Sequence, residues 1–229
     1  MGLNIIFEDE HILVIKKDAG IPVQAGKMRM MDLQGLIKNE LYRRNPKAGE
    51  PYLGIVHRLD QPVEGVMVFA KTPFAAGSLS EQVTDGRMKK HYLALVCGKP
   101  TEDTGKLVDY LIKDGRTNTS SVAKAYTKEA KRAELNYCVL GEVEVPEFDG
   151  VTTLVEVELI TGRHHQIRVQ MANAGWPLYG DTKYNPKFQQ TEEYVQTALC
   201  AYKLSFVHPK TKKCMEFCIE PDNSMLKQG

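Results

Sequence analysis

Three residues that could do chemistry stand close together in the sequence: His57, Arg58 and Asp60. They belong to the stretch GIVHRLDQPVEGVMVFAK, residues 54–71. Residues 66–70 of this stretch form a short apolar run between a glycine and a proline, which predicts a buried strand. A carboxylate beside a buried strand needs partners to stay ionised. Asp60 is therefore expected on a loop carried by a rigid strand, where reactive groups are usually held.

An Arg-x-Asp motif in a loop has two interpretations. Most often it is a solvated or structural ion pair, and less often it belongs to a catalytic site. The motif by itself leaves both interpretations open, so the other segments of the chain must decide between them.

The segments around this stretch predict strands and helices that could position it. Residues 4–17 read as two strands around a turn. Residues 32–45 carry leucine and isoleucine at helical spacing behind Asp32, a common N-cap residue type. Thr-Pro at residues 72–73 predicts a helix start, with a capping hydroxyl followed by proline at the first helical position. That helix is expected to end at Gly86.

The second half of the chain is richer in strands. Residues 92–96 read as a strand after a basic turn, and the segments 134–145 and 152–162 as two more. Residues 101–131 are polar with little periodicity, so we expect a short strand and an exposed excursion there. Residues 164–174 predict a helix, and two strands around a turn close the chain. This pattern favours an α+β domain with a mixed, largely antiparallel central sheet and flanking helices.

Composition limits the functional class. The chain has 229 residues, 42% of them hydrophobic and 26% charged, ordinary values for a soluble globular protein. No apolar run approaches the length of a membrane helix, and the N-terminus is acidic where a signal peptide is basic, so we expect a cytoplasmic protein without membrane contact. The net charge of +1 does not indicate a nucleic-acid binder, although basic runs occur at 87–91, 163–165 and 210–213.

Three motifs follow one another in a specific order. VHRLDQPVEGVMVFAKT (56–72) is followed by KKHYLALVCG (89–98) and then by ELITGRHHQIRVQMANAGWPLYGDTKY (158–184). Together they resemble the RluA-like family of RNA pseudouridine synthases, and the resemblance covers nearly the whole chain. HRLD alone would be a weak match, but the three motifs in this order are specific.

The resemblance implies a role for each matching residue. Asp60 would be the nucleophile that attacks the target uridine, and Arg58 would help to extrude that nucleotide and fill the gap it leaves. Tyr92 would stack against the uracil and act as, or position, the base that removes the proton from carbon 5. Arg168 would pair with Asp60 in the floor of the pocket. Further substrate-binding residues are expected at His57, Leu59, Arg163, His165 and Ile167.

The chain departs from the family pattern at three places. Val-Glu-Gly at residues 63–65 stands where the family usually has T-S-G. His164 follows G-R where Thr or Ser is usual, and Lys-Asp-Ala-Gly at residues 17–20 replaces N-K-P-A-G. None of these changes removes an expected catalytic group, so they bear on substrate identity and not on the chemistry.

The resemblance also implies what the protein needs and what it acts on. Isomerising uridine involves neither redox change nor net hydrolysis, so we expect no cofactor and no metal. His164 and His165 are adjacent in the predicted helix and would not face one ion, and the five cysteines include no C-x-x-C pair. We expect a single catalytic domain over residues 1–229, without a separate N-terminal RNA-binding domain, that acts as a monomer on ribosomal or transfer RNA.

The sequence therefore predicts an RNA pseudouridine synthase, with two alternatives. A non-catalytic RNA-binding module of the same fold would tolerate Asp60→Asn, whereas an isomerase would not. A hydrolase of a small glycoside or nucleoside would commonly need a second carboxylate as general acid. Glu64 and Asp181 are the only neighbours that could supply one.

Overall fold

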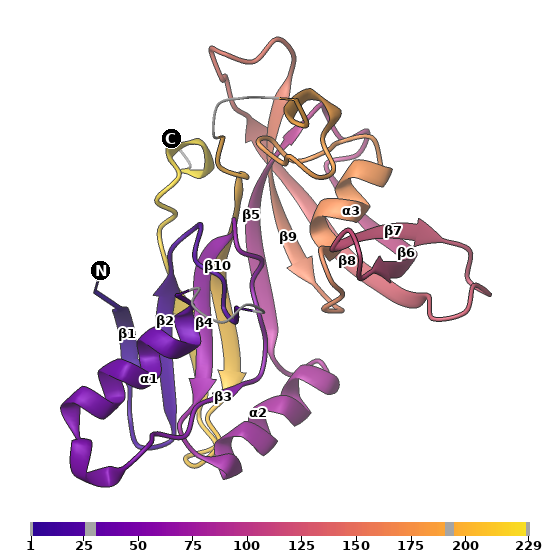
Figure 1. Cartoon of the computed structure of the whole chain (residues 1–229). Helices are drawn as coiled ribbons and strands as arrows, with labels where there is room; N and C mark the ends of the chain where they lie inside the picture. Colours follow the sequence, from indigo (N-terminus) through magenta and orange to yellow (C-terminus); the bar gives the residue numbers. More distant parts are fainter. Residues whose placement is uncertain (1, 26–30, 191–194, 228–229) are drawn as a thin grey trace. The chain divides into compact units, whose positions relative to one another are not determined.

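The chain forms two compact units, each built from strands and helices (Figure 1). Unit 1 consists of Met1–Lys89 with Ala201–Glu220, and unit 2 of Lys90–Cys200 with Pro221–Gly229. The structure is a computed structural model, and it describes residues 2–25, 31–190 and 195–227. The expected α+β class is confirmed.

The described residues of unit 1 form a sheet with two α-helices. Its strands are β1 (Asn4–Glu8), β2 (Ile12–Lys17), β3 (Gly54–Ile55), β4 (Glu64–Ala70), β10 (Leu199–Val207) and β11 (Cys214–Cys218). Its helices are α1 (Leu33–Arg44), the short 3₁₀ helix η1 (Pro46–Ala48) and α2 (Pro73–Thr84). The strands lie in the order β1-β2-β4-β10, with β11 on β10 and β3 on β4. Pairs β1–β2, β2–β4 and β10–β11 are antiparallel.

The centre of unit 1 is β4, whose seven residues are all buried. Its residues Val66 and Val68 pack in one cluster with β2 and with Ala75 and Leu79 of α2. A strand buried in this way reads as a continuous apolar run without alternation. The prediction of a buried strand over residues 66–70 is confirmed.

Both predicted helix caps in unit 1 are formed. The Asp32 carboxylate accepts a hydrogen bond from the Gly35 N–H at 2.7 Å, and the Thr72 hydroxyl accepts one from the Ala75 N–H at 3.2 Å. Each cap satisfies a backbone donor that has no partner within the helix. The two helices therefore begin where the sequence predicts.

Gly65, at the start of β4, is required by a close approach of β10. Its φ of +152° is a conformation that other residues rarely adopt, and a Cβ added there would lie 2.4 Å from the Cβ of Ala201. Only glycine lets the two strands meet here. This contact fixes the beginning of β4, directly after the loop that carries Asp60.

Unit 2, over the residues that are described, is a five-stranded antiparallel sheet with one α-helix. Its strands are β5 (Lys89–Cys97), β6 (Thr104–Asp114), β7 (Thr119–Ala123), β8 (Lys131–Glu142) and β9 (Thr152–Leu159). Its helices are α3 (Gln166–Asn173) and the 3₁₀ helices η2 (Pro186–Phe188) and η3 (Ser224–Leu226). The strands lie in the order β5-β9-β8-β6-β7, and all four neighbouring pairs are antiparallel.

The prediction of a short strand and an excursion over residues 101–131 is wrong in extent. This segment contains β6, with 11 residues, and its hairpin partner β7. Leu111 is buried in a cluster with Val169 of α3, whereas Val108, on the opposite face of β6, is 45% exposed. Because apolar residues lie on both faces of β6, the alternation that would identify a strand is lost.

Helix α3 begins at Gln166, two residues later than the sequence predicts. His165 has a φ of +53° and therefore lies in the left-handed region, outside the helix. Side-chain pattern alone does not indicate such a conformation, which histidine adopts only occasionally.

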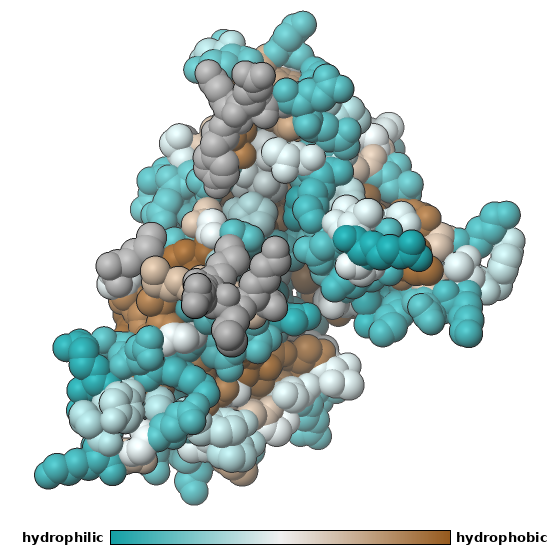
Figure 2. Space-filling model, viewed as in Figure 1, coloured by the Kyte–Doolittle hydropathy of each residue, from teal (hydrophilic) through white to brown (hydrophobic). Residues whose placement is uncertain are grey.

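Hydrophilic side chains predominate on the face shown in Figure 2, with smaller hydrophobic patches between them. Within the described part of the chain, no helix has the length and apolar character needed to cross a membrane.

At one end of unit 1, the Asp9 carboxylate joins the turn before β2 to the turn after β10. It accepts hydrogen bonds from two backbone N–H groups at 2.7 and 2.8 Å and from Nε2 of the buried His208 at 2.8 Å. Nδ1 of His208 accepts from the N–H groups of Lys210 and Thr211, so its proton is on Nε2. Burial raises the pKa of Asp9, but these hydrogen bonds outweigh it and the net pKa is lowered.

We expect Asp9→Asn to weaken the acid dependence of stability. The lowered pKa means that the carboxylate contributes stability above its unfolded-state value, and that this contribution is lost as the pH falls through the folded-state value. Urea denaturation of wild type and variant between about pH 3 and pH 7 measures the effect. Glu10→Gln, at an exposed neighbour, is the control. Parallel pH profiles for wild type and Asp9→Asn would contradict the expectation.

Candidate active site

The predicted site residues fall into two groups, one in each unit. Unit 1 carries His57, Arg58, Leu59 and Asp60, and unit 2 carries Tyr92, Arg163, His165, Ile167 and Arg168. The predicted pairing of Asp60 with Arg168 joins residues of different units and stays a prediction. The geometry within each group is described in turn.

Asp60 lies on the loop between β3 and β4, as expected. Its carbonyl accepts a hydrogen bond from the Val63 N–H at 3.1 Å, which closes a turn just before β4. His57 ties the start of the loop to the strand, because its Nε2 accepts from the Val68 N–H at 3.1 Å. Leu59 is buried and Arg58 is exposed. The loop thus holds Asp60 firmly while the Arg58 guanidinium faces solvent.

Lys17, at the end of β2, holds the Asp60 loop in place by hydrogen bonds from its buried side chain. Its side chain is fully buried, and its Nζ donates to the carbonyls of Asp18 (2.9 Å), Gln61 (3.2 Å) and Val63 (2.7 Å). Burial lowers the pKa of Lys17 to about 8, and the charge of Asp60, followed by those of Asp18 and Glu64, opposes this shift. A positive charge and the predicted nucleophile are therefore electrostatically coupled.

Gly20 adds a second attachment for the same loop. Its N–H donates to the Gln61 carbonyl at 2.8 Å, and the Gln61 side-chain amide donates to the Gly20 carbonyl at 3.0 Å. The segment 17–20, although it departs from the family pattern, therefore contacts the Asp60 loop through both its lysine and its glycine.

In unit 2, Arg168 is held by Asp181. Nε and Nη2 of Arg168 donate to the two carboxylate oxygens of Asp181 at 2.8 and 2.6 Å, and the side chains are only 3% and 0% exposed. Asp181 also accepts from the N–H groups of Lys183 and Tyr184 at 2.9 and 3.2 Å. A two-pronged pair of this kind fixes the plane of the guanidinium.

Tyr184 connects α3 to the β6–β7 hairpin. Its hydroxyl accepts from the Ser120 N–H at 2.8 Å and lies 2.6 Å from Nδ1 of His165. The guanidinium of Arg168 lies over the Tyr184 ring, 5.2 Å from its centroid. His165 stacks on His164 with ring centroids 3.8 Å apart. These contacts surround the first turn of the helix that carries Arg168.

His165 is a neutral group in this setting. Burial first, and then the nearby charges of Arg168 and His164, lower the pKa of His165 to about 2. The predicted contact of His165 with substrate, which stays a prediction, would therefore use an uncharged imidazole.

The remaining predicted residues of unit 2 differ in exposure. Tyr92, on β5, and Ile167, on α3, are 5% exposed. Arg163 is exposed, and its Nε donates to the Arg132 carbonyl at 2.9 Å. Tyr92 and Ile167 are thus buried side chains, whereas Arg163 is exposed.

Sequence reasoning missed two residues that hold the predicted groups in place, Lys17 and Asp181. A lysine that ends an apolar strand, and an aspartate within the G-D-x-x-Y motif, were the available signals. Within residues 2–25, 31–190 and 195–227, no cluster of three His, Cys, Asp or Glu side chains is arranged to hold a metal ion.

We expect Asp181→Asn to destabilise the fold. The change leaves the buried Arg168 guanidinium without its carboxylate, and such a loss typically costs about 3–5 kcal/mol. The free energy of unfolding in urea measures it, with Asp149→Asn, at an exposed position, as the matched control. A loss below about 1 kcal/mol would show that the pair contributes no more than an ordinary surface contact.

Comparisons with known proteins cover most of the chain. A sequence profile described as RNA pseudouridylate synthase matches residues 11–173. A protein of Nitrosomonas europaea named ribosomal large subunit pseudouridine synthase D is 36% identical over 90% of this chain and 58% of its own length. A protein of Bacillus subtilis named as an uncharacterised RNA pseudouridine synthase is 35% identical over 95% of this chain and 68% of its own length.

Solved structures agree on the fold. Human RNA pseudouridylate synthase domain containing 1 superposes with a TM-score of 0.76 over 96% of this chain and 84% of its own, at 23% identity. Human RNA pseudouridylate synthase domain containing 4 also superposes with a TM-score of 0.76. The match covers 96% of this chain and 89% of that protein's chain, at 22% identity. The chain spans little more than half of the Nitrosomonas relative. The profile match and the Bacillus relative together show that this chain belongs to the RNA pseudouridylate synthase family.

Proposed function

We propose that this protein is an RNA pseudouridine synthase. Such an isomerase breaks the bond between uracil and ribose, turns the base and rejoins it through carbon 5. The observation that carries the proposal is Asp60, held on a fastened loop before a buried strand, at the position of the aspartate in the HRLD motif.

Ribosomal RNA is the first candidate substrate. Several relatives are named ribosomal large subunit pseudouridine synthases, and transfer RNA is the alternative from sequence. We propose further that the protein acts in the cytoplasm as a monomer, and that residues 1–229 work as one catalytic domain.

The chemistry requires an ionised nucleophile and a displaced base. A nearby cation favours the charged form of a carboxylate, and the charge of Asp60 opposes the lowering of the Lys17 pKa by burial. Taking the target base out of its stack costs a few kcal/mol. The exposed Arg58 is suited to fill the gap, because a guanidinium is planar and able to stack. Stacking of the uracil on Tyr92 would offset about 1–3 kcal/mol of the cost of unstacking the base.

Arg168 is the proposed partner of Asp60 across the pocket. Its bond to Asp181 supports this role, because a guanidinium whose plane is fixed needs no reorganisation when substrate binds. Asp181 would then be a positioning residue that acts through Arg168.

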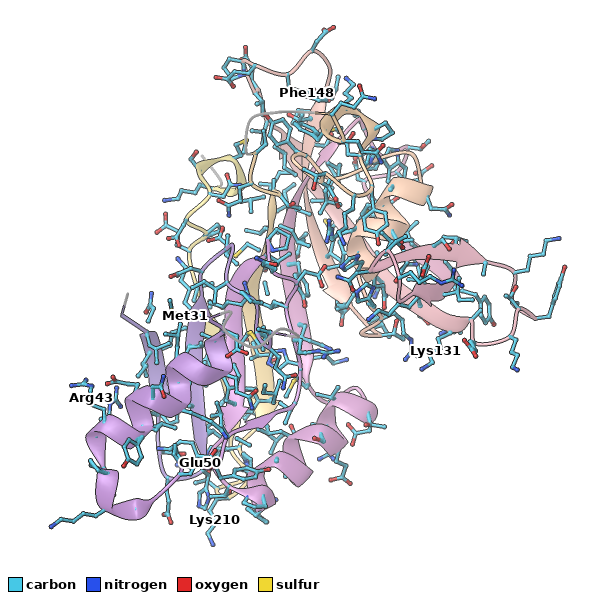
Figure 3. All side chains as sticks on the ribbon, viewed as in Figure 1. Met31, Arg43, Glu50, Lys131, Phe148 and Lys210 are labelled. Carbon is cyan, nitrogen blue, oxygen red and sulfur yellow. The ribbon has the colours of Figure 1, made fainter. Side chains whose placement is uncertain are left out.

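The basic runs differ in their suitability as phosphate contacts. Arg87 forms ion pairs with Asp85 at 2.7 Å and Glu81 at 3.4 Å, so its charge is largely compensated. Lys210 lies on the turn after β10 (Figure 3), at the end of unit 1 where His208 binds Asp9. Asp60 lies at the other end of β4, roughly 20 Å away. Lys210 would contact phosphates remote from the target nucleotide.

The hydrolase alternative is not favoured by the two available carboxylates. Asp181 is 0% exposed and bonded to Arg168, and Glu64 is 1% exposed within β4. A general acid must reach the leaving group, and neither side chain is presented to solvent.

We expect Asp60→Asn to abolish pseudouridine formation while RNA binding persists, because the amide cannot act as the nucleophile. Carbodiimide mapping of ribosomal and transfer RNA, from cells lacking the gene and complemented with each variant, measures the outcome. Asp149→Asn is the control and should restore every site. Full modification by Asp60→Asn, or release of free uracil by wild type, would contradict the proposed function.

We expect Lys17→Met to lower turnover on the order of a hundredfold, because a displaced Asp60 loses its alignment with the reacting atoms. Methionine keeps the length of the side chain but donates no hydrogen bond to the Gln61 and Val63 carbonyls. Single-turnover assays on ribosomal RNA from cells lacking the gene provide the rate. Lys38→Met, which removes a partly exposed lysine paired with Glu50, is the control. A folded Lys17→Met variant with wild-type turnover would exclude a role in positioning.

A further inference from the structure

Lys90 is a buried cation that the proposed mechanism does not use. It is the second residue of β5, and only 9% of its surface is exposed. Side chains two apart on a strand share one face, so Lys90 and Tyr92 face the same side of β5. Their Cα atoms are therefore about 6.6 Å apart along the strand.

Lys90 has no internal partner in the part of the chain that the structure describes. Among the described residues, no oxygen accepts a hydrogen bond from its Nζ and no carboxylate lies within ion-pair distance. The other two deeply buried cations differ, since Lys17 donates to three carbonyls and Arg168 is bound by Asp181. Burial lowers the pKa of Lys90, with no nearby acid to oppose it. A buried charge without a partner is unfavourable unless a ligand supplies one.

The end of the Lys90 side chain lies beside the backbone of Gly162. A Cβ added to this glycine would be 3.5 Å from the Lys90 Nζ, and Gly162 itself is exposed. The glycine follows β9 and precedes α3, in the G-R-H-H-Q-I-R motif. The Lys90 Nζ is not among the buried unsatisfied atoms of the described residues, so the ammonium reaches the surface beside a residue without a side chain, where an anion has room to approach.

We propose that Lys90 binds a backbone phosphate of the RNA, next to the nucleotide whose base stacks on Tyr92. This inference rests on the proposed function, which supplies the RNA. A phosphate oxygen gives the ammonium the charged acceptor that the protein does not provide. The short spacing to Tyr92 assigns that phosphate to the target nucleotide or to its immediate neighbour.

The site differs from paired cations on the surface, one of which, Arg87, belongs to the same basic run as Lys90. Arg87 and Lys99 are paired with acids on the surface, so RNA would have to replace an existing partner. Lys90 has no such partner among the described residues, and the aliphatic part of its side chain is already buried against the protein. A contact made by such a side chain loses less conformational entropy than one made by a solvated lysine.

The test is the salt dependence of RNA binding, measured in an Asp60→Asn background so that no turnover occurs. The probe is large-subunit ribosomal RNA transcribed in vitro. Lys90→Met is expected to weaken binding by about tenfold at low salt and to reduce the slope of log affinity against log salt by about 0.7–0.9, the value for one lost phosphate contact. Lys90→Arg should keep the slope, and so should the control Lys99→Met.

Stability provides an independent readout. Because Lys90→Met removes an unpartnered buried charge, the variant should be at least as stable to urea as its Asp60→Asn parent. Weaker binding can then not be attributed to unfolding.

An unchanged slope in Lys90→Met overturns the proposal, as does wild-type binding that does not depend on salt. Loss of turnover when Lys90→Met is made with Asp60 intact, together with an unchanged slope in the Asp60→Asn background, would also overturn it, because Lys90 would then act on the uracil ring. Pseudouridine formation by wild type on the same RNA is followed in parallel. A changed slope without any pseudouridine would refute the proposed function and leave the phosphate contact standing.

Discussion

A fully buried ammonium holds the Asp60 loop in place. A lysine charge is stable away from water only when oxygen atoms surround it, and the carbonyls of Asp18, Gln61 and Val63 do so for Lys17. The charges of Asp60 and Glu64 favour its protonated form. The loop and the lysine therefore depend on each other: the loop supplies the carbonyls, and the ammonium fixes the conformation that carries Asp60.

In unit 2 the buried ion is a carboxylate, and it too needs partners of opposite charge or polarity around it. The Asp181 carboxylate is surrounded by the guanidinium of Arg168 and by two backbone N–H groups. Asp60 and Arg168 are thus each oriented by a buried ion of opposite sign or by the backbone around one. Among the buried cations in the described ranges, Lys90 lacks such a partner, and its environment therefore indicates an external anion.

Signals from residues close together in the sequence were sufficient to predict many of the strands and helices. The apolar run of β4 and the caps at Asp32 and Thr72 depend on residues close together in the chain, and all three are formed. The extent of the β6–β7 hairpin was missed because β6 has apolar residues on both faces. The left-handed His165, which delays α3, depends on surroundings that the pattern of α3 does not reveal.

The predicted site residues came from motifs, whereas the groups that hold them came from the structure. Lys17 reaches carbonyls 44 and 46 residues away in the chain, and no sequence spacing connects these positions. Asp181 lies in a recognisable motif, but its bond to Arg168 appears only once α3 and the following loop have folded together. Long-range partners of buried charges are therefore the part of such a site that sequence reasoning finds last.

The Tyr184 hydroxyl provides a hydrogen-bond acceptor for the backbone amide of Ser120. Ser120 lies in β7, the edge strand of unit 2, where an amide that points away from the sheet normally exchanges its hydrogen with solvent quickly. Here that N–H donates to Tyr184, whose ring also lies against Arg168 and whose hydroxyl contacts His165. The exchange rate of this single amide hydrogen therefore reports whether the first turn of α3 is packed, without any probe being added to the protein.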